Sequence, residues 1–198
     1  ITQQELFESI EKVMLGPERK SHLLSKKEKE ITAYHEAGHA IVASVLPYAD
    51  PVHKVSIIAR GSAGGYTLKL PLEERKLQSK KEFIDDIAMS LGGYVAEEMM
   101  FGDITTGPSS DLQAASNLAR AMVTRWGMSS VIGPVALASG GGRMPYSEDV
   151  QKEHSEDIAK KVDAEVSKLI QNGLKSAEKV LAENKKAFVA IALKLIEV

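Results

Sequence analysis

Apolar residues recur three and four positions apart along most of the chain, a spacing that places them on one face of a helix. Two shorter stretches, 52–59 and 66–70, are rich in β-branched or alternating apolar residues and lie next to Gly or Pro, which predicts strands. The predicted fold class is therefore mainly α with a small β-sheet or hairpin. The helices expected are residues 2–14, 29–46, 79–101 and 110–126, and two more between 148 and 198.

Glycines stand inside two of these predicted helices, where each costs about 1 kcal/mol relative to alanine. They are Gly38, which follows Ala37, and the pair Gly92-Gly93. Residues this small let the backbone of another element approach closely, which offsets the cost. We therefore expect both sites to mark places where a helix packs tightly against a neighbouring element.

The composition narrows the classes of function. Hydrophobic residues make up 43% and charged residues 26% of the 198 residues, with a formal net charge of −2. That balance is typical of a soluble globular protein and does not favour nucleic acid as a partner. No apolar run approaches the roughly 20 residues that span a bilayer, so we expect no direct membrane contact. Because cysteine is absent, any metal must be held by His, Asp or Glu.

The segment His35-Glu36-Ala37-Gly38-His39 carries the clearest chemical signal. Residues i and i+4 of a helix lie on one face, so the two imidazoles can converge on one metal ion. Glu36 is rotated by about 100° from His35 and can reach a water on the open side of the metal. This is the arrangement of a metallopeptidase, in which zinc acidifies the water and a carboxylate removes its proton.

The third metal ligand stays open when only spacing is used. A catalytic zinc usually has three protein ligands and one open position. A third histidine six residues after His39 is absent, because that position is Val45, and no acid stands between Asp50 and Glu73. His53 and Asp111 remain. Spacing alone favours reading His53 as a histidine packed in a strand. It favours reading Asp111 as an ordinary acid in the first turn of a helix.

An ordered set of motifs then resembles the FtsH family of membrane-anchored, ATP-dependent zinc proteases. The resemblance covers nearly the whole chain and is far more specific than the histidine motif alone. The segments that carry it are Thr32 to Ala40, Asp50 to Val55, Gly65-Tyr66-Thr67, Leu91-Gly92-Gly93, Ala96-Glu97-Glu98, Phe101-Gly102, Thr105-Thr106-Gly107, Ser110-Asp111-Leu112, Ala119-Arg120 and Trp126 to Ser129.

This resemblance implies roles for particular residues. His35, His39 and Asp111 match the three ligands of one zinc ion per chain, and Glu36 matches the catalytic base. Glu97 matches an acid near the site, where it is expected to accept a hydrogen bond from a ligand histidine; the pattern alone favours a solvated helix face there. Nitrogen and oxygen ligands accept other divalent ions as well as zinc.

The resemblance also implies a setting for the chain. Family members are homo-hexamers in which an ATPase ring feeds polypeptide substrates to the protease ring. This sequence has no Gly-rich phosphate loop ending in Lys-Ser or Lys-Thr, so no ATP site is expected. We interpret 1–20 as the tail of an ATPase lid or linker and 21–198 as the peptidase domain, excised or from a truncated paralogue. The full-length protein is expected to be membrane-anchored and to face the cytoplasm, an organelle matrix or the stroma.

The function predicted is a zinc endopeptidase that cuts unfolded or membrane-extracted proteins. The predicted strand near 65–70 is expected to hold substrate by strand addition, which uses backbone groups and tolerates many sequences. Two alternatives remain at this level. One is a zinc-stabilised hexamerisation module that is inactive without its motor. The other is a metal-dependent amidohydrolase that acts on small substrates.

Overall fold

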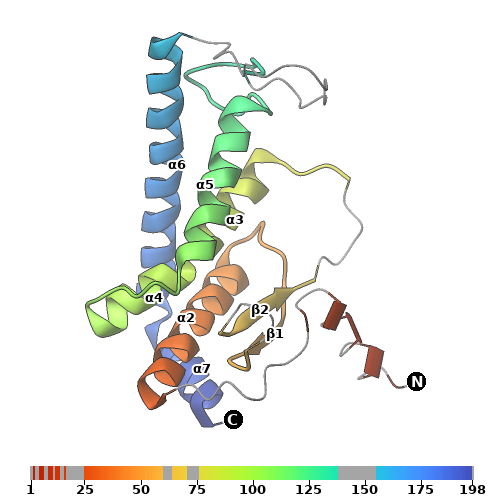
Figure 1. The fold of residues 1–198 in the computed structure, drawn as a ribbon, viewed down its shortest axis with the longest axis vertical. Helices are drawn as coiled ribbons and strands as arrows, with labels where there is room; N and C mark the ends of the chain where they lie inside the picture. Colours follow the sequence, from red (N-terminus) through yellow and green to blue (C-terminus); the bar gives the residue numbers. More distant parts are fainter. Residues whose placement is uncertain are drawn as a thin grey trace, which may run out of the picture.

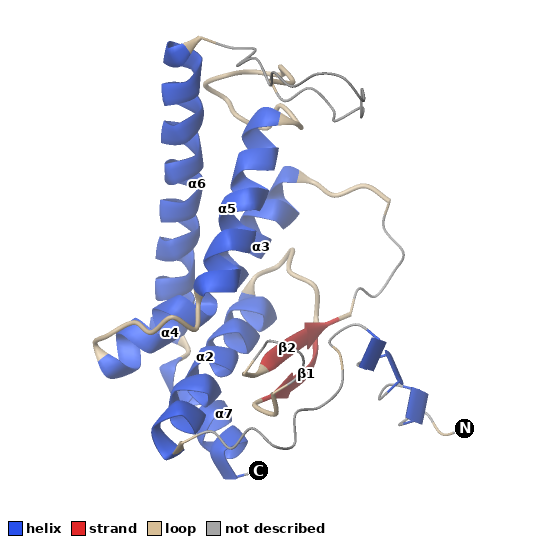
Figure 2. Cartoon of the chain, viewed as in Figure 1, coloured by secondary structure: helices blue, strands red, loops and turns tan. Residues whose placement is uncertain are grey.

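A computed structural model describes residues 25–59, 64–70, 76–137 and 155–197, together with isolated positions between 2 and 16. The predicted N-terminal helix and the domain boundary after residue 20 lie largely outside this part of the chain. Helices and strands are coloured separately in Figure 2. The helices are α2 (Lys26–Val45), α3 (Lys80–Ser90), α4 (Gly92–Phe101), α5 (Ser109–Thr124), α6 (Glu156–Glu183) and α7 (Lys185–Glu197), and the strands are β1 (Val52–Ser56) and β2 (Tyr66–Lys69).

The predicted fold class is confirmed, since the described residues are mostly helical and form one antiparallel sheet of two strands. In Figure 1, α3 and α5 lie beside the long helix α6, while α2 lies below them with α4 and α7. The sheet covers a further side of α2. Helix α2 is therefore surrounded by most of the other elements, which places its sequence motif in the interior. No described helix is long and apolar enough to cross a membrane.

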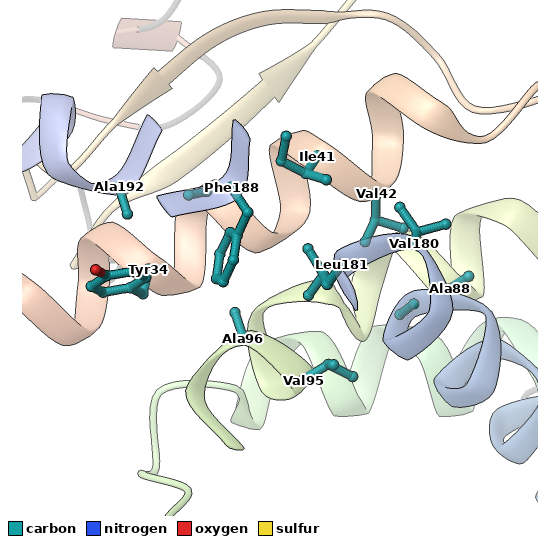
Figure 3. Close-up of a cluster of buried hydrophobic side chains, with 12 residues drawn as sticks. Tyr34, Ile41, Val42, Ala88, Val95, Ala96, Val180, Leu181, Phe188 and Ala192 are labelled. Carbon is teal, nitrogen blue, oxygen red and sulfur yellow. The ribbon is translucent and has the colours of Figure 1, made fainter. Parts of the chain in front are cut away.

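Helix α2 begins three residues before the predicted start. The Ser25 side chain accepts from the Glu28 backbone N–H while the Glu28 carboxylate accepts from the Ser25 N–H, so two otherwise unpaired donors are satisfied. From Ala33 to Ala43 every residue of the helix is buried. Figure 3 shows the hydrophobic cluster in which α2 packs against α7, with Phe188 of α7 next to Tyr34 of α2. Their ring centroids are 5.6 Å apart in an edge-to-face arrangement.

The single helix predicted for 79–101 is wrong, because the structure has two helices that meet at Leu91. This residue caps both, with φ −85° and ψ −4°, a backbone conformation that ends one helix and lets the next leave in another direction. The change of direction brings α4 onto α2. A Cβ on Gly38 would overlap the Gly92 carbonyl oxygen, and one on Gly92 would stand 2.9 Å from the Gly38 oxygen. The expected close approach at both glycine sites is confirmed.

Strands β1 and β2 are shorter than predicted and pair antiparallel, with Val55 opposite Thr67. A register shift between Val52 and Lys54 interrupts the regular pairing at the start of β1. The Lys69 ammonium lies 2.9 Å from Asp86 Oδ1 of α3, and both side chains are about four-fifths buried, at 20% and 23% exposure. This ion pair ties the end of β2 to the helices.

Candidate metal centre and catalytic cleft

Three of the predicted site residues meet although they come from two helices. His35 and His39 lie on α2, and Asp111 lies in the first turn of α5. Their ligand atoms all lie within 4.8 Å of one another. The His35 Nε2 atom is 3.0 Å from His39 Nε2 and 3.2 Å from Asp111 Oδ2, and His39 Nε2 is 3.5 Å from the same carboxylate oxygen.

The other ring nitrogens fix the orientation of both imidazoles. His39 Nδ1 lies 2.8 Å from the Met89 carbonyl oxygen, which can only accept, so Nδ1 carries the proton. His35 Nδ1 lies 2.8 Å from Glu97 Oε1. Glu97 is almost wholly buried, at 1% exposure, and its second oxygen accepts from the Thr105 backbone N–H at 2.8 Å. When each imidazole is deprotonated at Nε2, as a metal ligand must be, its lone pair therefore points into the site.

This arrangement fits a zinc ion. Two nitrogen lone pairs and a carboxylate oxygen converge at 3.0–3.5 Å, a repulsive grouping unless a cation or a proton lies between them. Ligands on a tetrahedral zinc at about 2.0–2.1 Å lie roughly 3.3 Å apart, close to the separations observed here. Two hydrogen-bonded imidazoles and one carboxylate form a donor set that zinc accepts, with a position left for water or substrate.

Hydrogen bonds and burial shift the pKa values of these groups in opposite directions. Burial lowers the pKa of His35, but hydrogen bonds to Asp111 and Glu97 and nearby acids outweigh it and raise the pKa to about 9. Burial raises the pKa of Asp111 and Glu97, yet their contacts with His35 leave both pKa values below the usual range. A proton on His35 therefore competes with a metal ion for the same position.

Zinc affinity is therefore expected to fall as the pH falls. Because the His35 pKa is about 9, zinc must displace a proton from Nε2 at lower pH. One displaced proton predicts a loss of affinity of about tenfold per pH unit between pH 8.5 and 7. Competition with a coloured chelator measures this slope, and an affinity that is independent of pH in this range would contradict it.

Glu36 follows His35 on α2 and is buried, at 6% exposure. Its carboxylate oxygen Oε2 accepts a hydrogen bond from the Thr67 hydroxyl at 2.8 Å. Burial raises the pKa of Glu36, against the opposing effect of His39, His35 and the Thr67 hydroxyl. A carboxylate with a raised pKa beside a metal position is suited to accept a proton and later return it.

A cleft of about 850 Å³ opens over these residues. It is walled by the N-terminal half of α2, by β2, and by the segment that leads into α5. The described residues that line it include Ile31, Thr32, Gly65, Thr67, Thr105, Thr106 and Ser109. A volume of about 850 Å³ lies within the range of ligand-binding clefts in proteins.

His53, which the residue types left as a candidate ligand, is exposed on β1 and does not belong to the converging group.

Several contacts of the site were not predicted individually from the sequence. The Met89 carbonyl, the Thr67 hydroxyl and Gly93 do contact the site residues, and a Cβ on Gly93 would overlap the His35 ring. In the sequence, only the glycine pair 92–93 and the predicted strand at 66–70 pointed to these places. Neither feature shows which site residue is contacted.

Comparisons with known proteins identify the family of the chain. The model of "Peptidase family M41" matches residues 22–198. The chain belongs to peptidase family M41. Similar proteins include the "ATP-dependent zinc metalloprotease FtsH" of Veillonella parvula, 46% identical, and FtsH 3 of Petrotoga mobilis, 48% identical, both matched over 100% of this chain. FtsH 1 of Sphaerobacter thermophilus is 47% identical over the same extent.

The M41 chain covers 31%, 31% and 30% of these three relatives, so it spans about three tenths of their length. The resemblance seen in the motifs is thereby confirmed for the family. As an M41 member, the chain is a zinc metalloendopeptidase domain.

Proposed function

We propose that this domain hydrolyses peptide bonds of unfolded or membrane-extracted proteins at one zinc site. The observation that carries the proposal is the convergence of His35 Nε2, His39 Nε2 and Asp111 Oδ2 next to the buried carboxylate of Glu36. We assign the two histidines and the aspartate as zinc ligands and Glu36 as the base. When bound, zinc supplies a Lewis acid that polarises the scissile carbonyl and acidifies water.

The side chains of the domain perform the remaining steps. Glu36 accepts the proton of the attacking water and delivers it to the amine that leaves, which its raised pKa favours. Glu97 holds His35 by the Nδ1 hydrogen bond and keeps the Nε2 lone pair directed into the site. The Met89 carbonyl does the same for His39.

The substrate is proposed to lie extended in the cleft along β2, where Tyr66 and Thr67 of the strand and the preceding Gly65 line the wall. Pairing with a strand uses backbone groups of the substrate, so it requires an unfolded segment but little particular sequence.

In the whole protein, we propose that the domain assembles as a homo-hexamer and receives substrate from an ATPase that lies outside 21–198. The similar proteins of Veillonella parvula and Petrotoga mobilis are ATP-dependent zinc metalloproteases more than three times longer than this chain, which supports this setting. Residues 1–20 are proposed as the tail of the ATPase lid or linker, consistent with a family match that begins at residue 22. We propose that the full-length protein is membrane-anchored and faces the cytoplasm, an organelle matrix or the stroma, while this domain itself makes no membrane contact and binds no ATP or nucleic acid.

Metal removal tests the proposal directly. The chain as purified with zinc is expected to degrade casein, an unfolded substrate, and to lose this activity after dialysis against a chelator. One equivalent of zinc per chain should restore it, since the three ligands form one site. The measurements are release of labelled casein fragments and metal content by elemental analysis.

Three outcomes would refute parts of the proposal. Casein cleavage that persists in a verified metal-free sample would refute zinc chemistry. Turnover of small amides but not of casein would favour the amidohydrolase alternative. A zinc-loaded chain that forms hexamers by sedimentation but cleaves nothing would favour the assembly module.

A further inference from the structure

Thr67 joins strand β2 to the carboxylate of Glu36. Its Oγ1 atom lies 2.8 Å from Glu36 Oε2 and 3.2 Å from the Glu36 carbonyl oxygen. A hydroxyl has one proton to donate, and the carboxylate oxygen is the nearer of the two acceptors, so the hydroxyl bonds the carboxylate. We propose that Thr67 is a positioning residue that holds the Glu36 carboxylate in its working orientation; this inference rests on the peptidase function proposed above.

Glu36 needs such a contact because its own side chain does not fix the carboxylate. The terminal torsion of glutamate has broad, weakly defined minima, unlike the staggered torsions nearer the backbone. On helix α2 the backbone sets only where the side chain starts. The hydroxyl of Thr67 supplies a fixed point for one oxygen and leaves the other, Oε1, available for proton transfer.

Gly65 supports the same orientation from the other side. A Cβ built on Gly65 would stand 2.9 Å from both Oε1 and Cγ of Glu36, so a side chain at this position would push the carboxylate away. Strand β2 and the residue just before it therefore act on different carboxylate oxygens. Thr67 bonds Oε2, and Gly65, which directly precedes β2, leaves room for Oε1.

The strand that carries this hydroxyl is itself held in place. Residues two apart in a strand face the same way, so Thr67 and Lys69 share a face of β2. Thr67 bonds Glu36 of α2, and Lys69 pairs with Asp86 of α3 at 2.9 Å. On its paired edge β2 is bonded to β1, with Val55 opposite Thr67. A donor fixed on three sides is preorganised, which is the property that positioning a base requires.

The test compares kcat, KM and zinc content of variants of the zinc-loaded chain on a fluorogenic casein-derived peptide. Thr67→Val keeps the shape but removes the donor, and it should lower kcat by about ten- to a hundredfold while KM stays within about twofold. This loss is smaller than the roughly 10²–10⁴-fold contribution of a general base. Thr67→Ser keeps the hydroxyl and should remain within about threefold of the unmodified chain.

Two further comparisons separate positioning from a structural role. Thr124→Val removes a half-buried hydroxyl that bonds the Arg120 carbonyl on α5, and it should leave kcat unchanged. In a Glu36→Gln background, Thr67→Val should cause no additional loss of activity, because its effect passes through the carboxylate that is already gone.

The outcomes distinguish this inference from the function on which it rests. Equal kcat for Thr67→Val and the unmodified chain would overturn the positioning role, as would a full additional loss in the Glu36→Gln background or failure of Thr67→Ser to retain activity. In each of these cases the peptidase function stands. If the unmodified zinc-loaded chain shows no chelator-sensitive hydrolysis, the proposed function itself fails.

Discussion

Replacement of Glu36 by Gln is expected to lower peptide hydrolysis by roughly 10²–10⁴-fold, the contribution typical of a general base. Glutamine has the same shape but cannot accept the proton of the attacking water at neutral pH. Zinc should stay bound, because the three converging ligand atoms belong to His35, His39 and Asp111. Casein degradation and metal content, measured on the same sample, check both halves of the prediction.

The fold of this variant should be at least as stable as that of the unmodified chain. Burial disfavours the charged form of Glu36, as its raised pKa reflects, and a neutral amide removes that cost. The matched control is Glu98→Gln, the same change at an exposed position of α4, which should leave activity intact. A Glu36→Gln chain that retains both zinc and full activity would show that another group is the base.

The sequence predicts the helical framework well where local signals act. Apolar periodicity placed α2 and α5 to within three residues, while for α6 and α7 it gave only two helices between 148 and 198. The start of α2 was missed although Ser25 and Glu28 have the spacing of a capping box, so this error was avoidable. Periodicity does not detect a change of direction when the helical hydrogen bonds continue almost without a gap, which is why the break at Leu91 was missed.

The candidate site also contains one part that local sequence predicts and one part that it does not. The pair His35 and His39 follows from helix geometry, because four residues make about one turn. Asp111 is 76 residues from His35, and spacing left it as an ordinary helix acid. Its approach to the histidines depends on how α4 and α5 pack against α2, which no local pattern encodes. The family resemblance supplied the assignment that the physics of spacing left open.

Contacts that depend on packing alone could not be predicted from the sequence. The bond between Thr67 and Glu36 joins residues 31 positions apart across a strand and a helix. At Gly93 the sequence signalled a close approach, but it did not show that the approaching group is the His35 ring. An alanine there would displace a proposed ligand, so this glycine serves the metal position as well as the packing of α4 on α2.

Replacement of Asp111 by Ala is expected to lower zinc affinity by more than about 100-fold. This exceeds the 10–100-fold that loss of a residue supporting a ligand typically costs, because a proposed ligand itself is removed. Two histidines would remain, one fewer than the usual protein set of a catalytic zinc. Competition with a chelator gives the affinity, and elemental analysis after dialysis gives the stoichiometry.

Two further variants, compared with Asp111→Ala, test whether Asp111 is a zinc ligand. Glu97→Gln keeps all three proposed ligands but weakens the hold on His35, so its affinity should fall by about 10–100-fold and lie between Asp111→Ala and the unmodified chain. Asp103→Ala removes an exposed acid from the preceding loop and should change nothing. If Asp111→Ala binds zinc as tightly as Asp103→Ala, Asp111 is not a ligand. If Glu97→Gln loses more affinity than Asp111→Ala, the roles of the two acids are reversed, with Glu97 the ligand.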